Sequence, residues 1–136
     1  MTTRKLVTLG LASTLALAGA GAAIGQGSSL AMLDRLDRGN WDIRYRGGDG
    51  DPGNLCVATG REFIQLRHRQ DRCSRVVVED APGEVVVQYT CPGKGYGRTS
   101  VRRETSGLVQ IQSQGIENGL PFSFAAEARR SGGCRR

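Results

Sequence analysis

Four cysteines carry the firmest chemical signal in this 136-residue sequence. They are Cys56, Cys73, Cys91 and Cys134. An even number of cysteines in a short chain is typical of disulfide pairs formed in an oxidising compartment. A four-cysteine zinc site would usually contain a Cys-x-x-Cys pair, and this sequence has none. We therefore expect two disulfides and no metal, and the count alone leaves three pairings open.

A single histidine, His68, limits the catalytic chemistry that the chain can offer. A histidine-based triad would have to use it, and a histidine-rich metal site is excluded. His68 lies among Arg67, Arg69 and Arg72, so we expect an exposed surface side chain. The sequence also lacks a Gly-x-Ser-x-Gly nucleophile motif.

Acid–base catalysis would instead depend on dispersed carboxylates. Glu79, Glu84 and Glu104 lie in segments with strand character. Such a set would suit an envelope hydrolase, because glycosidases use paired carboxylates. Carboxylates on exposed strands are usually solvated, so this remains an alternative function and we expect no catalytic residues.

The glycine-rich segment at 47–54 resembles a calcium loop only in part. Asp49 and Asp51 place alternate carboxylates in it. However, the sixth position from Asp49 is Asn54 and the twelfth is Gly60, where a calcium loop needs glycine and glutamate. We therefore expect an ordinary hairpin loop.

The segment Gly-Lys-Gly-Tyr-Gly at 93–97 has the glycine content of a phosphate loop but not its Lys-Ser or Lys-Thr ending. We expect a turn here and no cofactor. Tyr96 and Lys94 remain candidates for the rim of a ligand site.

The densest positive stretch of the chain holds five arginines. It is a candidate surface for an anionic partner, such as an acidic envelope polymer, lipid head groups or an envelope protein. Glu62 and Asp71 dilute its charge, so a solvated segment is the alternative. Nucleic acid is not an expected partner outside the cytoplasm. The five residues, called the arginine stretch below, are Arg61, Arg67, Arg69, Arg72 and Arg75.

Residues 1–25 have the features of a secretory signal peptide. Arg4 and Lys5 precede a long apolar run, and small residues follow that run. Cleavage is expected between Ala22 and Gln26, because small residues alternate there.

Residues 26–136 then form a single periplasmic or secreted domain of about 110 residues. No later segment has the length of apolar sequence that spans a bilayer, so no stable membrane insertion is expected after cleavage. Losing the two cations of the signal peptide lowers the formal net charge from +6 to +4, a mild bias.

A short N-terminal helix is expected between Ser29 and Gly39. Ser29 would cap it, Leu30, Leu33 and Leu36 would share one face, and Gly39 would end it. So short a helix is stable only if its leucines pack on the rest of the domain.

Strand patterns begin at Trp41. Trp41, Ile43 and Tyr45 alternate with polar residues, which indicates a half-buried strand with Trp41 in the core. Residues 55–57 return as a second strand, and residues 59–72 are expected to form irregular helical turns.

The clearest hairpin joins the β-rich segments 74–80 and 84–90 through Ala-Pro-Gly at 81–83. A three-residue loop places Cys73 directly opposite Cys91, where a cross-strand disulfide can form. A two-residue Pro-Gly turn would shift the register by one residue and remove that opposition. The first register favours the pairs Cys73–Cys91 and Cys56–Cys134.

Three further strands are expected at 98–104, 108–114 and 120–129. A two-residue Asn118-Gly119 turn brings Ile111 opposite Ala126, so apolar residues share one face. The fold class is therefore all-β: a mainly antiparallel curved sheet, sandwich or small barrel with a short N-terminal helix, stapled by disulfides.

The order of these landmarks resembles a bacterial family of exported proteins catalogued as domain of unknown function 3617. That family opens with Pro-Gly-x-Trp, matched here by residues 39–41 with Arg38 in place of the proline. Its four cysteines are similarly placed: Cys91 is followed by Pro-Gly, and Cys134 follows a basic, glycine-containing phrase. The resemblance implies export and a disulfide framework, and it brings no activity and no catalytic residues.

The function expected from these features is a non-enzymatic binding or interaction module of the cell envelope. A rigid, stapled β domain without an acid–base constellation suits this role. An inhibitor of a hydrolase is one concrete version of it. A carboxylate-dependent envelope hydrolase and a structural or stress-protective protein are the alternatives.

Overall fold

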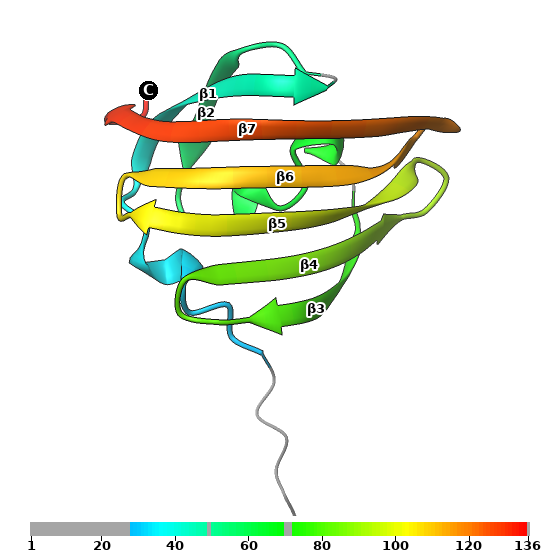
Figure 1. The fold of residues 1–136 in the computed structure, drawn as a ribbon, viewed down its shortest axis with the longest axis horizontal. Helices are drawn as coiled ribbons and strands as arrows, with labels where there is room; N and C mark the ends of the chain where they lie inside the picture. Colours follow the sequence, from blue (N-terminus) through cyan, green and yellow to red (C-terminus); the bar gives the residue numbers. More distant parts are fainter. Residues whose placement is uncertain (1–27, 49, 70–71, 136) are drawn as a thin grey trace, which may run out of the picture.

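The computed structural model describes residues 28–48, 50–69 and 72–135, so the predicted signal peptide lies outside the described residues. They form one antiparallel sheet of seven strands in the order β2-β1-β7-β6-β5-β4-β3 (Figure 1). The edge strands β2 and β3 do not pair with each other in the described residues, so the sheet is open rather than a closed barrel. The strands are β1 (Gly39–Gly48), β2 (Gly53–Val57), β3 (Ser74–Asp80), β4 (Glu84–Cys91), β5 (Gly95–Thr105), β6 (Leu108–Glu117) and β7 (Leu120–Gly132).

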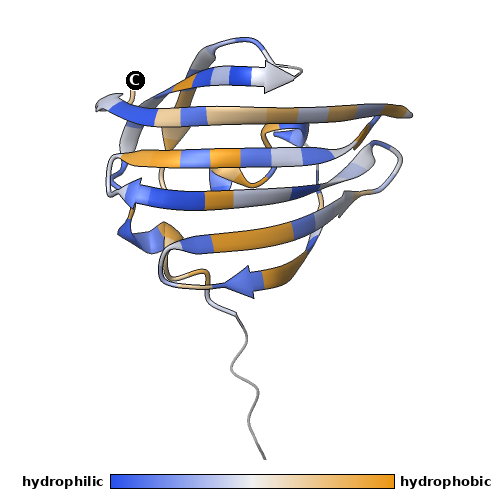
Figure 2. Cartoon of the chain, viewed as in Figure 1, coloured by the Kyte–Doolittle hydropathy of each residue, from blue (hydrophilic) through white to orange (hydrophobic). Residues whose placement is uncertain are grey.

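Alternation along the strands gives the sheet one apolar and one polar face. In β6, Val109, Ile111 and Ser113 are buried, whereas Gln112 and Gln114 between and after them are exposed. Figure 2 shows the same alternation of hydrophobic and hydrophilic residues along the central strands. The predicted all-β, antiparallel class is thus confirmed, and its buried face includes Trp41, which is fully buried as expected.

Two irregular segments cover the apolar face from behind (Figure 1). Residues 28–38 contain the 3-10 turn η1 (Leu33–Arg35), and residues 58–69 contain η2 (Arg61–Phe63) and η3 (Leu66–His68). The second segment has the irregular turns that the sequence predicts. The apolar side chains that the two segments bury against the sheet are Leu30, Met32, Leu33, Leu36, Phe63, Ile64 and Leu66.

The predicted N-terminal helix is not confirmed, because only the single turn η1 forms there. Leu30 has a positive φ of 55°, and its N–H donates to the Asp80 carboxylate at 3.0 Å. Leu36 is already extended, and the next N–H, of Asp37, donates to the Ser106 carbonyl at 2.8 Å. The two ends of the segment therefore bond to β3 and to the turn between β5 and β6 rather than to a helix of their own.

The predicted registers are confirmed for the β3–β4 hairpin at its cysteine end and for the β6–β7 hairpin along its length. Val77 pairs with Val87 and Ser74 with Thr90, the register that brings Cys73 opposite Cys91. The three-residue loop is not confirmed: beyond a bulge after Val77, Asp80 pairs with Val85, and the Ala81 N–H donates to the Glu84 carbonyl at 2.9 Å around a two-residue Pro-Gly turn. Asn118 and Gly119 have φ values of 49° and 82°, as a two-residue hairpin turn requires.

The expected disulfides are both present. Cys56 bonds to Cys134 with a Cα–Cα distance of 5.5 Å, and Cys73 bonds to Cys91 with a Cα–Cα distance of 4.2 Å. Within the described part of the chain, no helix is long and apolar enough to cross a membrane. The disulfides are compatible with an extracellular location.

Removing either disulfide tests how the chain depends on its cross-links. Because the bonded cysteines are 78 and 18 residues apart, loop-closure entropy predicts that the longer link contributes more. Replacing Cys56 and Cys134 by alanine should lower the free energy of unfolding by about 4 kcal/mol, and replacing Cys73 and Cys91 by about 3 kcal/mol. Denaturant unfolding of the two double variants measures both values, and the reverse order would contradict the prediction.

Candidate functional site

The polar face of the sheet is organised into rows of side chains that cross the strands. Two rows are defined by the register of β4, β5, β6 and β7. The Arg98 row consists of Gln88, Arg98, Gln114 and Ser123. The neighbouring Ser100 row consists of Val86, Ser100, Gln112 and Ala125. Directly opposed residues lie roughly 5 Å apart at Cβ, so each row presents a near-continuous strip.

These rows line a groove on the polar face. One hollow of about 510 Å³ includes Arg98 and the Ser100 row and reaches Gly47 and Gly48 at the end of β1. A second hollow of about 370 Å³ includes Tyr96 and the whole Arg98 row. Because the two share Arg98, Gln114 and Ser123, they form one continuous depression, called the outer groove below.

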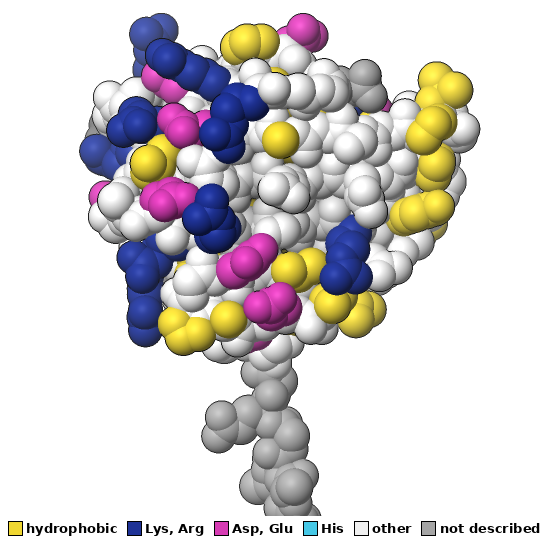
Figure 3. All heavy atoms as spheres, viewed as in Figure 1, with side chains coloured by type: hydrophobic (Ala, Val, Ile, Leu, Met, Phe, Trp, Pro, Cys, Tyr) yellow, Lys and Arg dark blue, Asp and Glu magenta, His cyan; other side chains and the backbone are white. Residues whose placement is uncertain are grey.

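The lining of the outer groove is neutral except at one place. Arg98 is the only charged side chain among the described residues that line either hollow. In the described part of the chain it forms no ion pair, although Arg102 farther along the strand pairs with Glu104 at 2.8 Å. Figure 3 shows the centre of this face largely free of charged and hydrophobic side chains, with charges gathered on its left side.

A hydrophobic rim bounds the groove at the opposite end, on the right of Figure 3. Tyr96 is 50% exposed and Leu120 is 71% exposed. Tyr96 also lines a hollow beside the turn at 92–95 that Lys94 helps to form. The predicted rim residues therefore lie together, next to the groove rather than at a phosphate loop.

The carboxylates predicted for a hydrolase lie outside the outer groove. Glu84 accepts a hydrogen bond from Ser100 at the groove's edge, Glu104 pairs with Arg102, and Glu79 is exposed on β3. On the same charged side, hydrogen bonds from Gln110 and the nearby Arg129 hold the pKa of Glu127 below its usual value. The groove therefore has no pair of carboxylates facing each other.

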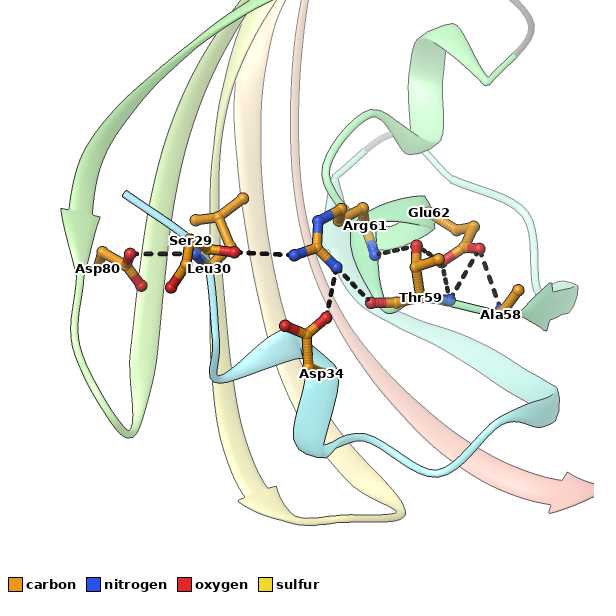
Figure 4. Close-up of polar contacts among 8 residues, drawn as sticks. All are labelled: Ser29, Leu30, Asp34, Ala58, Thr59, Arg61, Glu62 and Asp80. Carbon is orange, nitrogen blue, oxygen red and sulfur yellow. Dashed lines mark hydrogen bonds and ion pairs between the residues drawn. The ribbon is translucent and has the colours of Figure 1, made fainter. Parts of the chain in front are cut away.

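The arginine stretch is divided by the fold. Arg61 is a structural residue: it donates to the Asp34 carboxylate at 2.7 Å and to the carbonyls of Ser29 at 2.8 Å and Thr59 at 3.1 Å (Figure 4). The hydrogen bond to Asp34 lowers the pKa of that carboxyl. Glu62 closes the same turn by accepting from the N–H groups of Ala58 and Thr59. Arg61 thus joins the two segments that cover the sheet.

The other four arginines point to different places. Arg67 pairs with Glu117 at 2.6 Å and lies over the Phe122 ring, with 5.5 Å between the guanidinium carbon and the ring centroid. Arg75 donates to Gln65 at 2.7 Å, and Arg69 and Arg72 are exposed. A hollow of about 360 Å³ brings together Arg61, Arg69 and Arg75, with Glu62 beside them.

The prediction of an exposed His68 is wrong. The side chain is only 2% exposed, and its Nδ1 lies 3.1 Å from the Tyr89 hydroxyl. Its ring also contacts Phe122 at a centroid distance of 6.1 Å. Among the described residues, the buried Nε2 has no hydrogen-bond partner. The surrounding arginines point outward, whereas η3 turns the histidine inward.

Buried hydroxyls continue this polar cluster. Thr99 Oγ1 donates its single proton to the Ile64 carbonyl at 2.6 Å, so it accepts from Ser113 at 2.8 Å. Tyr89 is 1% exposed, and burial raises its pKa to about 12. The cluster fixes the second covering segment to the sheet and is closed to ligands.

The described residues contain no group of three or more His, Cys, Asp or Glu side chains that would hold a metal ion. Asp49 of the glycine-rich loop lies outside the described residues, and Asp51 is exposed. The groove residues Arg98, Gln112 and Gln114 were not singled out by the sequence. The alternation of polar and apolar residues along the strands predicts that these side chains share one face. Which of them are neighbours across strands can be stated only when the register is known.

Replacing Arg61 tests its structural role against a matched arginine. Arg61→Ala removes three side-chain hydrogen bonds, of which the two to Asp34 and Ser29 join the covering segments, and should lower the free energy of unfolding by about 1–3 kcal/mol. Arg69→Ala changes an exposed side chain and should alter that free energy by less than about 0.5 kcal/mol. Equal effects in chemical denaturation would show that Arg61 does not hold the segments together.

The raised pKa of Tyr89 predicts an alkaline loss of stability. Its folded pKa of about 12 exceeds the ordinary value of 10.0, so the folded chain keeps the phenol proton to higher pH than the unfolded chain. Unfolding therefore releases a proton between these values, and stability falls as pH rises through them, by up to about 1.4 kcal/mol per pH unit. Tyr89→Phe should lack this extra slope in unfolding measured from about pH 9 to about pH 11. A slope shared by both proteins would refute the assignment.

Comparisons with protein-family models, with curated proteins and with solved structures found no match to this chain.

Proposed function

We propose that this chain is an exported, non-catalytic binding module that holds a glycan chain along its outer groove. The single observation that supports this role is the continuous groove on the polar face. Its central strands present carboxamides and hydroxyls, Val86 and Ala125 lie at its two sides, and a tyrosine lies at its rim. Gln and Ser side chains both donate and accept, as sugar hydroxyls do, so they match a neutral polyhydroxylated ligand. The exposed ring of Tyr96 offers an apolar platform with a polar tip.

A glycan fits this groove better than a peptide does. Extended peptides bind chiefly by adding a strand to a sheet edge or by inserting apolar side chains into hydrophobic grooves. The outer groove lies on a sheet face, where the backbone groups already pair between strands, and its central lining is polar. The side chains, rather than the backbone, must therefore recognise the ligand.

Export is supported by the predicted signal peptide and by the two disulfides, which persist in oxidising compartments. The resemblance to the exported family of unknown function points the same way. The alternative of a hydrolase is less well supported. A glycosidase needs two facing carboxylates inside its groove, whereas Glu79, Glu84 and Glu104 lie outside this one.

Removing two groove amides tests the proposal. Calorimetric titration of the disulfide-bonded protein would use neutral glucose oligomers and galacturonic acid oligomers as probes. We expect at least one of them to bind. Gln112→Ala combined with Gln114→Ala should weaken binding about tenfold, because each lost hydrogen bond costs about 0.5–1.5 kcal/mol.

Gln110→Ala is the matched control. Gln110 lies on the same strand and face but outside the groove, and its amide is already bonded to Glu127 at 3.1 Å and to Arg46. This variant should bind within about twofold of the unchanged protein. Absence of binding to both probes, or equal affinities in the double variant and the unchanged protein, would overturn the proposal. Extended peptides that bind through the same glutamines, without glycan binding, would also overturn it.

A further inference from the structure

We infer that the glycan held in the outer groove is acidic, with a sugar carboxylate on Arg98 and the adjoining sugar ring on Tyr96. This inference rests on the proposed function and names the ligand class more narrowly. Its two anchors lie two residues apart on β5 and project from the same face. Two residues of a strand span roughly 7 Å, a suitable distance between a ring face and the carboxylate of a neighbouring sugar.

Charge complementarity at Arg98 carries the first half of the inference. Arg98 is exposed, lies where the two hollows meet and forms no ion pair in the described part of the chain. Four other arginines in the described part of the chain pair with carboxylates, namely Arg61, Arg67, Arg102 and Arg129, and Arg98 differs from the exposed Arg69 and Arg72 by its place in the groove. A guanidinium fork presents two parallel N–H donors, which match the two oxygens of a carboxylate.

The residues around Arg98 favour a carboxylate on an otherwise neutral ligand. Its direct neighbours across the strands are Gln88 on β4 and Gln114 on β6. Neither competes with the ligand for the positive charge, and both supply donors and acceptors for the flanking hydroxyls. One isolated cation among neutral amides suits one negative charge per sugar better than a densely charged polyanion.

Tyr96 carries the second half. Its ring is 50% exposed beside the same groove, although most large apolar side chains of the domain are buried. Its direct cross-strand neighbours are Thr90 and Ile116, and the Tyr96 ring lies at the end of the groove. Lys94, in the adjacent hollow, would meet a second carboxylate if the acidic chain continued past the ring.

The test compares galacturonic acid oligomers with their methyl esters, which keep the sugar and remove the charge. By calorimetry, we expect the unchanged protein to bind the free acid at least about tenfold more tightly than the ester. Arg98→Gln should abolish this preference and still bind the ester. Tyr96→Ala should weaken acid and ester about equally, and Tyr96→Phe should restore both.

Arg35→Gln is the matched control, because Arg35 is an exposed arginine on η1, outside the groove. It loses the same formal charge and should keep the preference for the acid. Equal binding of acid and ester, with binding still sensitive to loss of Gln112 and Gln114, would overturn this inference and leave the proposed function standing. Competition by inorganic phosphate but not by acetate would overturn the choice of a carboxylate. Absence of binding to either oligomer and to neutral glucans would instead overturn the proposed function.

Discussion

The apolar face of a single sheet has to be covered, and the rest of this structure depends on how that is done. The described residues contain no α-helix to serve as a second layer, so two irregular segments take that place. Each segment makes only a few backbone hydrogen bonds of its own, in short 3-10 turns, and each is also bonded to distant parts of the chain. Arg61 joins the two segments through Asp34 and the Ser29 carbonyl, while Thr99 holds the second segment to β5. Polar bonds fix the position of an apolar layer that has little regular structure of its own.

Covering one face so completely leaves the other face available. The buried cluster of His68 and Tyr89 belongs to the covered side, so the most unusual polar groups of the domain are closed to ligands. The face open to solvent carries Arg98 among neutral amides and hydroxyls at its centre and charged pairs toward one side. A ligand can therefore contact the strand residues of the open face but not the buried histidine.

The strands and their pairing were largely predictable, because local turn chemistry sets register. Counting from the Asn118-Gly119 turn gives the partner of Ile111 correctly. Counting from the Pro-Gly turn at 82–83 misses the partner of Cys73 by one residue, and the bulge after Val77 restores the predicted pair. His68 was not predictable, because its burial depends on Tyr89 and Phe122, which lie far away in the sequence. The helix failed for a similar reason: its leucines are buried as expected, but Leu30 bonds to Asp80 on β3. The groove was not predictable, because its rows are defined only when the register of β4, β5, β6 and β7 is known together.

The disulfide pattern is nested, since the bond between Cys73 and Cys91 lies within the loop closed by Cys56 and Cys134. A chain that folds as it is made meets Cys73 long before Cys134. The inner hairpin can be oxidised early, but Cys56 must wait as a free thiol until almost the whole domain has been synthesised. Premature bonding of Cys56 to either inner cysteine would be a dead end that only thiol–disulfide exchange can reverse. Efficient production of the native domain therefore depends on an isomerising environment as well as an oxidising one.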